Sequence, residues 1–405
     1  MDSVLNPENK IVWVGPFVEN SGYSYMNREH VRGLCNSNWD VYLEEVPCPM
    51  EVSQKDVAFI RSLKYLDERG MPGICFDPQS IKIVGWIPLK KIPPFKHNVL
   101  YTMMESKEAG AGFIDVCNEF YNSCWVPTEY CKKSFIDQGV KVPVNVVPIG
   151  VDPIYHPDNV IPGFNLNYEV FSKRENAPFK PLGFKFLSVF RWSYRKGFDV
   201  LLKSYLREFK HTDDVSLVIV SKHASASREK RFEDAVRDEI QEYVNKFSNE
   251  DSPPIYWCKE NIPADKMPSM YAVGDCFVLP SRGEGLALPA LEAAKMGLPC
   301  ILPNHTAFSD YVTDENCFTF DVDDWEVCDT NPKWGVWITR VYSGERFPIF
   351  GDSVVDNVSY LMRKVFDDPE KGKEKNKEMQ KTVDNKFAWD KCTQAASNCL
   401  KEIIN

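Results

Sequence analysis

Strand-like and helix-like segments alternate along most of this 405-residue chain, in two successive series. In the first series, an apolar segment at residues 11–14 precedes a helical pattern at 25–34 and a second apolar segment at 41–43. The second series begins at residues 184–190 with the same kind of strand. This alternation predicts parallel strands with helices on both faces. We therefore expect an α/β protein with two Rossmann-like doubly wound domains.

A proline-rich stretch separates the two series. It contains Pro148, Pro153, Pro157, Pro162, Pro178 and Pro181. Such density is typical of an interdomain connection, and the chain is longer than one compact core usually supports. We predict an N-terminal domain at residues 1–165, a linker at 166–180, a second domain at 181–370 and a helical region at 371–405.

The composition is that of an ordinary soluble protein. A net charge of −10 argues against general binding to nucleic acid or to anionic membranes, so membrane contact should be peripheral at most. No apolar segment has the length of a membrane span, and the N-terminus lacks a leader pattern. The thirteen cysteines contain no Cys-x-x-Cys pair and should be reduced thiols. We expect a cytoplasmic location.

Two glutamates flank the entrance to a predicted helix in the second series. Glu284 and Glu292 lie around Gly285, after a strand pattern at residues 275–280, and Pro289 suits the first helical turn. The free N–H groups of that turn and of the loop form a natural site for a diphosphate. The candidate binding positions of this loop are Gly285, Leu286, Ala287 and Leu288.

Two cations follow the first strand of the same series. Arg191 and Lys196 lie just before a predicted helix at residues 197–209, where fixed positive charges and N–H groups can meet a diphosphate. The alternative is that both are solvated surface charges. Their position after a strand and before a helix favours a functional role.

Four motifs in order resemble those of a known family. The chain resembles the GT-B-fold retaining glycosyltransferases of family 4, also called glycosyl transferases group 1. The segments that carry this resemblance are residues 147–152, 190–202, 262–275 and 280–292. The resemblance implies two domains facing across a cleft, a C-terminal helix that packs back on the N-terminal domain, and a product that keeps the donor's anomeric configuration.

The resemblance also assigns roles to residues. It implies that Glu292 holds the nucleotide ribose, that Glu284 contacts the donor sugar, and that Arg191 and Lys196 bind the diphosphate. A carboxylate accepts two hydrogen bonds in parallel, which fits the vicinal hydroxyls of a ribose. Relatives commonly carry Phe-Gly where this chain has Leu286-Ala287.

Two further candidates lie in the first series. Ser21-Gly22 partly matches a glycine pair of the family in the loop after the first strand, and Gly22 completes the candidate donor-binding set. Glu105 follows the strand at residues 98–102, where many relatives have a histidine. Glu105 either accepts the acceptor's proton or binds its sugar, as a catalytic group, or is an ordinary loop carboxylate.

We predict no metal and no cofactor, because the nucleotide sugar is itself a substrate. None of the six histidines forms a spaced metal pair, and no Gly-x-Gly-x-x-Gly follows the first strand. The triplet at residues 321–323 matches a short metal-binding signature that often arises by chance.

The sequence therefore predicts a metal-independent glycosyltransferase of carbohydrate biosynthesis. Its partners would be a UDP- or GDP-sugar donor and a glycan or other hydroxyl acceptor, without nucleic acid. Two alternatives stay open: a catalytically silent GT-B module that binds a glycan or protein, and a sugar-nucleotide 2-epimerase.

Overall fold

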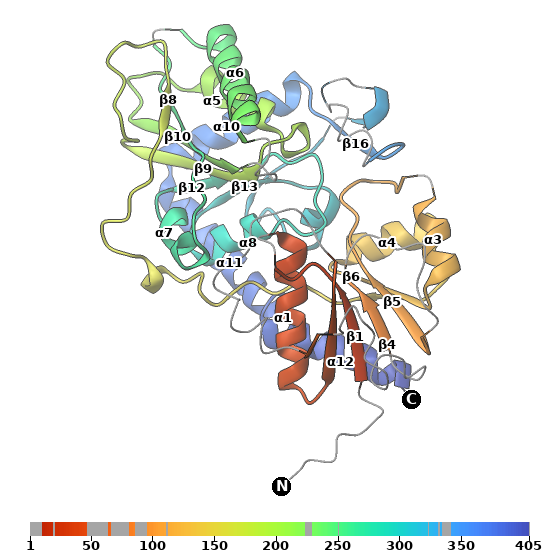
Figure 1. Cartoon of the computed structure of the whole chain (residues 1–405). Coiled ribbons are helices and arrows are strands. Elements are labelled where there is room, and N and C mark those ends of the chain that lie inside the picture. Colours follow the sequence, from red (N-terminus) through yellow and green to blue (C-terminus); the bar gives the residue numbers. More distant parts are fainter. Residues whose placement is uncertain are drawn as a thin grey trace. The chain divides into compact units, whose positions relative to one another are not determined.

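The computed structural model describes residues 10–18, 21–46, 64–65, 81–85, 95–110, 112–222, 229–249, 251–322, 324–330, 333 and 342–404. The chain divides into two compact units (Figure 1). One consists of Met1–Gly150 with Lys386–Asn405, and the other of Val151–Asn385. The proline-rich stretch that we expect to link the domains, residues 166–180, falls within the second unit of this division.

The first unit is built on a parallel sheet. In spatial order its strands are β3 (Lys64–Tyr65), β2 (Asp40–Glu45), β1 (Lys10–Gly15), β4 (Ile81–Val84), β5 (His97–Tyr101), β6 (Ser123–Val126) and β7 (Val144–Val146). Its helices are α1 (Gly22–Asn36), α3 (Phe113–Phe120), α4 (Glu129–Asp137) and α12 (Trp389–Ile404). The α1 helix begins where the Ser21 hydroxyl accepts the Ser24 backbone N–H at 3.2 Å, which satisfies one donor of the first turn.

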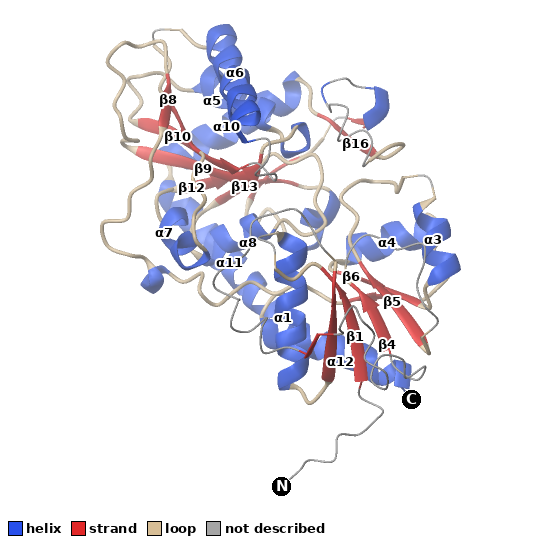
Figure 2. Ribbon diagram, viewed as in Figure 1, coloured by secondary structure: helices blue, strands red, loops and turns tan. Residues whose placement is uncertain are grey.

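Different helices cover the two faces of this sheet. Val12 and Val14 of β1 belong to one buried cluster with Val116 of α3 and Phe135 of α4. Trp13 lies between them in the strand and points to the other face, where its indole N–H donates to Asn27 of α1 at 2.9 Å. Figure 2 shows this layering of helices around strands.

The C-terminal helix α12 packs on α1 within the first unit. A side chain at Gly33 of α1 would put its Cβ 2.1 Å from the Thr393 hydroxyl, so the two helices approach closely only because this residue is glycine. The Trp389 indole donates to the Tyr25 hydroxyl at 2.9 Å. The Tyr25 hydroxyl in turn donates to the Gly150 carbonyl at 3.1 Å. The expected return of the C-terminal helix to the first domain is confirmed.

The second unit contains a mixed sheet with the strand order β14, β13, β12, β9, β10, β11, β8. Their bounds are β14 (Phe318–Phe320), β13 (Cys300–Pro303), β12 (Cys276–Val278), β9 (Phe184–Arg191), β10 (Val215–Lys222), β11 (Ile255–Cys258) and β8 (Glu169–Phe171). The edge strand β8 pairs antiparallel with β11, and the other neighbours are parallel. A separate antiparallel pair is formed by β15 (Asp324–Val327) and β16 (Arg346–Ile349).

Helices of the second unit connect and cover these strands. The longer ones are α5 (Phe198–Glu208), α6 (Glu229–Phe247), α8 (Leu288–Lys295), α10 (Asp352–Asp367) and α11 (Pro369–Lys386), and α7 (Met267–Tyr271) is a short one. Short 3-10 turns occur at Pro157–Asn159, Tyr194–Lys196, Ala264–Lys266, Thr306–Asp310 and Cys328–Thr330. On α5, the Ser204 hydroxyl donates to the Val355 carbonyl of α10 at 2.9 Å, which ties these two helices together.

The strand order places a topological switch point in each sheet. In the second unit the chain moves from β9 outward through β10 to β11, and then returns to the other side of β9 with β12. Loops that leave neighbouring strands in opposite directions create a crevice at their carboxyl ends, where α/β proteins bind ligands. The loops after β9 and β12 are therefore the first place to look for a site.

The predicted fold class is confirmed, and two details differ from expectation. Residues 321–351 follow neither a strand nor a helix pattern and so indicate a long loop or small insertion, but they contain the β15–β16 pair. No element is predicted where α10 lies, although its buried face follows a helical period. The sequence also predicts a helix at residues 57–68, of which the structure describes only residues 64–65, as strand β3.

Candidate functional site

The candidate site of the second unit lies on the two loops that follow β9 and β12. Residues 192–197 connect β9 to α5, and residues 279–287 connect β12 to α8. All of residues 281–287 are buried, which is unusual for a loop because its backbone polar groups must find partners inside the protein. Those partners come from the loop after β9 and from residues 306–311.

A close backbone approach joins the two loops. Gly197 has a φ of +71°, in the left-handed region that favours glycine. A Cβ at this position would lie 1.7 Å from the Pro280 carbonyl oxygen. The Arg282 backbone N–H also donates to the Arg195 carbonyl at 2.6 Å. Any side chain at residue 197 would force the loops apart.

A buried ion pair reinforces this junction. The Arg282 guanidinium donates two hydrogen bonds to the Asp199 carboxylate, at 2.8 and 2.9 Å, and a third to the Tyr194 carbonyl at 2.7 Å. The guanidinium also lies 3.7 Å from the centre of the Tyr194 ring. The side chains of Arg282 and Asp199 are 0% and 3% exposed, so this pair is shielded from solvent. It fixes the loop after β12 to the first turn of α5.

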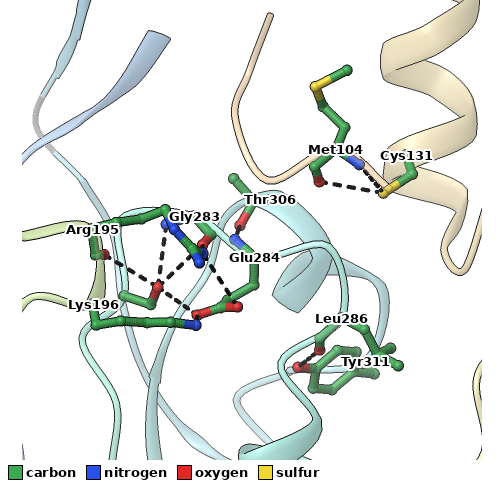
Figure 3. A network of polar contacts seen from close by, with 10 residues as sticks. Met104, Cys131, Arg195, Lys196, Gly283, Glu284, Leu286, Thr306 and Tyr311 are labelled. Carbon is green, nitrogen blue, oxygen red and sulfur yellow. Dashed lines mark hydrogen bonds and ion pairs between the residues drawn. The ribbon is translucent and has the colours of Figure 1, made fainter. Parts of the chain in front are cut away.

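Glu284 is the centre of a polar network (Figure 3). Its carboxylate accepts hydrogen bonds from the Lys196 ammonium and from the Ser281 hydroxyl, the latter at 2.7 Å, and lies 3.5 Å from the Arg195 guanidinium. Burial alone would raise the pKa of the Glu284 carboxyl, but the Lys196 and Arg195 cations beside it hold that pKa below its usual value. Glu284 is therefore ionised.

Two residues near Glu284 have backbone angles that side chains rarely adopt. Ala287, which precedes α8, has a φ of +67°, and Thr306 has a φ of +49°. The Glu284 backbone N–H donates to the Thr306 hydroxyl at 3.3 Å, and the Tyr311 hydroxyl donates to the Leu286 carbonyl at 2.6 Å. These bonds hold the loop in place while its backbone is strained. Strained residues of this kind cluster at functional sites.

Glu292 lies on α8, the helix that follows the loop after β12. Its carboxylate accepts a hydrogen bond from the Tyr271 hydroxyl at 2.6 Å and another from the Tyr155 hydroxyl. Burial raises the pKa of Glu292 to about 7, although the two phenols oppose the shift. At neutral pH this carboxyl is close to the midpoint of its titration.

His305 is a buried imidazole beside the same network. It is 6% exposed, and among the described residues neither of its ring nitrogens has a hydrogen-bond partner. The rings of Trp325 and Phe350 lie 5.9 and 6.1 Å from it. Burial lowers the pKa of His305 to about 3, so this side chain is neutral.

The first unit has its own group of polar residues after β1 and β5. Gly22 is the exposed first residue of α1, and a side chain there would meet no atom within 4 Å. Glu105 is half-buried in the loop after β5, and the Tyr23 and Thr102 hydroxyls lie 3.4 Å apart. Glu19 and Asn20, which precede Ser21 in the same loop, lie outside the described residues.

The same loop of the first unit is fixed by sulfur contacts. The Cys131 thiol donates to the Met104 carbonyl at 3.4 Å and accepts the Met104 backbone N–H at 3.4 Å (Figure 3). Glu105 is the next residue along the chain, so these contacts anchor the backbone that carries it.

The structure brings some predicted residues together and leaves others apart. Lys196 and Glu284, predicted for different parts of a ligand, form an ion pair with each other. Gly285, Leu286 and Ala287 continue the same buried loop, and Leu288 begins α8. Arg191 is exposed at the end of β9. Glu105 and Gly22 belong to the other unit. The roles of all these residues stay predictions.

Sequence reasoning missed several residues of the network. Arg195 and Ser281 contact Glu284 directly, Arg282 locks the loops, and Tyr271 holds Glu292. The only sequence signal for Arg195 and Ser281 is their position beside predicted residues. Tyr271 precedes β12 by a few residues, and nothing in its spacing points to Glu292.

The arrangement is suited to an anionic, hydroxyl-rich ligand. The loop after β9 supplies cations, and the loop after β12 supplies backbone N–H groups at the entrance to α8. Two carboxylates, Glu284 and Glu292, can accept hydrogen bonds from hydroxyls. Within the described ranges no three His, Cys, Asp or Glu side chains are grouped to hold a metal ion. Metal independence stays a prediction.

Comparison with known proteins places the site in a recognised domain. Residues 183–328 match the family model described as Glycosyl transferases group 1. The O-antigen biosynthesis glycosyltransferase WclY of Escherichia coli is 40% identical to this chain over 58 residues, which span 14% of this chain and 16% of that protein. Both loops of the site lie inside residues 183–328.

Solved structures resemble the whole chain. HepE from Anabaena, in complex with UDP and glucose, aligns with a TM-score of 0.63 and 12% identity over 97% of this chain and 99% of its own. A glycosyltransferase from Rickettsia africae aligns with a TM-score of 0.63 and 13% identity over 99% and 100%. Sucrose-phosphate synthase from Thermosynechococcus elongatus aligns with a TM-score of 0.61 and 12% identity over 98% and 99%.

Because the identity is low, these structures establish the fold and nothing beyond it. A separate observation concerns membranes: no helix in the described part of the chain combines the length and the apolarity needed to cross a lipid bilayer. The similarity to these structures shows that the chain has the GT-B fold, and residues 183–328 match the glycosyl transferases group 1 model.

Proposed function

We propose that this protein is a retaining, metal-independent glycosyltransferase of carbohydrate biosynthesis. It transfers a sugar from a UDP- or GDP-sugar to a hydroxyl of a glycan or similar acceptor in the cytoplasm. The observation that carries the proposal is the buried contact between Lys196 and Glu284 at the switch point of the second sheet, inside the group 1 domain.

The proposed donor site follows from the charges of the two loops. Lys196 and Arg191 bind the diphosphate, together with the backbone N–H groups of Gly285, Leu286 and Leu288. Glu292 accepts the ribose hydroxyls, and Glu284 accepts a hydroxyl of the donor sugar. UDP in the solved complex of HepE supports a uridine donor as the first candidate.

The ion pair between Lys196 and Glu284 must rearrange when the donor binds. A diphosphate brings a competing negative charge to Lys196, so part of the ammonium's interaction passes from Glu284 to phosphate. Arg195 and Ser281 remain to neutralise and hold Glu284, at 3.5 and 2.7 Å. Glu284 is then free to turn one oxygen towards a sugar hydroxyl without becoming an uncompensated buried charge.

The proposed reaction breaks the bond between the anomeric carbon and the phosphate oxygen. The electron pair of that bond goes to the leaving diphosphate, where Lys196 and Arg191 stabilise the growing charge. The acceptor hydroxyl attacks the anomeric carbon from the face that the phosphate leaves. Its proton goes to the departing phosphate or to Glu105. Because attack and departure share one face, the configuration is retained and no covalent carboxylate intermediate is required.

The acceptor is proposed to bind the first domain, residues 1–165, and the donor the second, residues 181–370. Gly22, first assigned to the donor set, and Glu105 are both carried by the first unit, which supports a role nearer the acceptor. Glu105 then either takes the proton or orients the acceptor sugar. Replacing Glu105 by Gln separates these roles, since only the first requires a carboxylate.

One experiment separates the proposal from its two alternatives. A thermal-shift panel of sugar nucleotides identifies the donor, because a ligand at 100 times its dissociation constant adds about 2.7 kcal/mol of stability. The donor is then incubated with and without candidate acceptors, and products are resolved by NMR. Transfer with an unchanged anomeric configuration supports the proposal. Stabilisation without turnover indicates a silent module, and an epimerised sugar nucleotide formed without acceptor indicates a 2-epimerase.

A further inference from the structure

The Glu292 carboxylate is held by two phenols from elements outside its own helix. Tyr271, at the end of α7, donates to Glu292 Oε2 at 2.6 Å, and the Tyr155 hydroxyl makes the second hydrogen bond. The two tyrosine rings meet edge to face, with centroids 5.7 Å apart. Tyr271 is 0% exposed and Tyr155 is 8% exposed. The carboxylate therefore meets a buried, rigid pair of donors.

Each of the two tyrosines is itself held by contacts with other residues of the second unit. The Tyr271 ring packs 6.3 Å from the ring of Phe277 on β12, the strand that leads into the site. The Tyr155 backbone N–H donates to the Asp152 carbonyl at 3.1 Å. A glutamate side chain has several rotatable bonds, and ordering them on binding would cost free energy. The tyrosines remove that cost before a ligand arrives.

The two hydrogen bonds leave room for a ligand. An ionised carboxylate has about four lone-pair positions, of which the tyrosines occupy two. We infer that Tyr271 and Tyr155 are positioning residues, which orient the Glu292 carboxylate so that its remaining lone pairs receive the vicinal 2′- and 3′-hydroxyls of a nucleotide ribose. This inference rests on the proposed function, because it takes Glu292 as the ribose ligand.

The same contacts should make the affinity for nucleotide depend on pH. The groups that face Glu292 are the hydroxyls of Tyr271 and Tyr155 and, as a neighbouring like charge, Asp152. Burial and Asp152 raise the pKa of Glu292 and the two phenols lower it, to a result of about 7. Only the ionised carboxylate accepts from both ribose hydroxyls. Affinity should therefore rise between about pH 6 and 8, and loss of a phenol should move the midpoint upward.

The test is calorimetric titration with UDP and with 2′,3′-dideoxyuridine 5′-diphosphate, which lacks both hydroxyls. GDP and its dideoxy analogue are titrated in parallel. The proteins are the wild type, Tyr271→Phe, Tyr155→Phe and a control, Tyr256→Phe. Tyr256 is a fully buried tyrosine of the second unit whose hydroxyl donates to the Pro178 carbonyl at 3.0 Å, so it matches the loss of one buried phenol away from Glu292.

We expect Tyr271→Phe to weaken the binding of UDP about tenfold, the scale of one hydrogen bond to a charged group. Binding of the dideoxy analogue should stay within twofold, and the pH midpoint for UDP should rise. Tyr155→Phe should show the same pattern, and Tyr256→Phe neither change. A second variant, Glu292→Gln, should remove the difference in pH dependence between UDP and its dideoxy analogue, because both nucleotides share the titration of the terminal phosphate.

Failures of the inference and of the proposed function are distinguishable. If the wild type prefers UDP to its dideoxy analogue but the two tyrosine variants weaken both nucleotides equally and keep the pH midpoint, the positioning role is wrong and the donor site stands. If the wild type binds none of the four nucleotides, the proposed function fails and this inference falls with it.

Discussion

The variant Asp199→Asn tests whether the buried ion pair holds the two loops of the site together. The substitution keeps the shape of the side chain and removes its charge. Arg282 would then be a buried cation, 0% exposed, that has lost the carboxylate bonded to it at 2.8 and 2.9 Å. The contacts that remain include the Tyr194 carbonyl and the rings of Tyr194 and Phe350, and none of these carries a full negative charge. Glu326 acts on the guanidinium only as a nearby charge.

The expected loss is large for a single atom change. Removing one partner of a buried ion pair costs about 3–5 kcal/mol, because the other charge is left uncompensated. For a unit of this size, one kcal/mol corresponds to about 2–4 °C in Tm. Thermal unfolding by differential scanning calorimetry should therefore show a fall of about 6–20 °C in the transition of the second unit.

Two further variants separate the causes. Asp356→Asn makes the same chemical change in an exposed pair, where Asp356 is 73% exposed and 3.5 Å from Arg207, and should change stability by less than about 0.5 kcal/mol. The double variant Asp199→Leu with Arg282→Met removes both charges and should recover much of the loss. A Tm for Asp199→Asn within about 2 °C of the wild type would refute the reasoning.

The remaining predictions concern catalysis, pH and backbone strain. Lys196→Ala should lower kcat about a hundredfold or more in a sugar-transfer assay, since it removes a cation from the leaving diphosphate, and near-normal turnover would contradict its role. The pKa of Glu292 is about 7 in the folded protein and 4.5 ordinarily, so the folded state binds the proton more tightly than the unfolded state. This proton stabilises the fold fully below pH 4.5, and the stabilisation is lost as the pH rises through 7. Urea unfolding should therefore show the wild type losing about 1–3 kcal/mol relative to Glu292→Gln between pH 4.5 and 8, whereas parallel curves would oppose the shift. Ala287→Val should destabilise the protein by about 1–3 kcal/mol, because a β-branched side chain disfavours a positive φ. Ala287→Gly should change stability by less than about 1 kcal/mol. Equal Tm values for the two variants would show that the backbone at residue 287 is not strained. Burial lowers the pKa of His305 from 6.5 to about 3, so it contributes stability that is lost as the pH falls through this range. The free energy of unfolding of His305→Leu should therefore rise by about 1–2 kcal/mol relative to the wild type between pH 7 and pH 5. A difference that does not change with pH would contradict the burial of a neutral imidazole.

The fold was largely predictable because its signals are local. Parallel strands buried on both faces appear in the sequence as short apolar runs, and the segment predicted at residues 11–14 lies within β1, Lys10–Gly15. The edge strand β8 was not predictable. Its three residues lie in the proline-rich stretch and become a strand only by pairing with β11, far away in sequence.

The α10 helix was predictable but overlooked. Its buried residues, Val354, Val355, Val358, Leu361, Met362 and Val365, recur at helical spacing, so the pattern alone indicates a helix. The segment before it, residues 321–351, follows neither the strand period nor the helix period along its length, because each strand of its β15–β16 pair has only four residues.

The sequence predicted candidate residues of the site but not their contacts. The order strand, loop and helix, together with the family resemblance, selected Lys196, Glu284 and Glu292, whose roles stay predictions. That Lys196 pairs with Glu284 depends on the left-handed turn at Gly197, which brings the loops together. The contact of Tyr271 with Glu292 likewise depends on how α7 and α8 pack, which no spacing in the sequence encodes.

The most direct test of the central claim is calorimetric titration of the whole protein with UDP, GDP and ADP. If the loops after β9 and β12 form a nucleotide-sugar site, at least one diphosphate should bind with a stoichiometry of one, and Lys196→Ala should weaken that binding. The absence of binding by all three nucleotides at millimolar concentration, in a protein that is folded by calorimetry, would contradict the account.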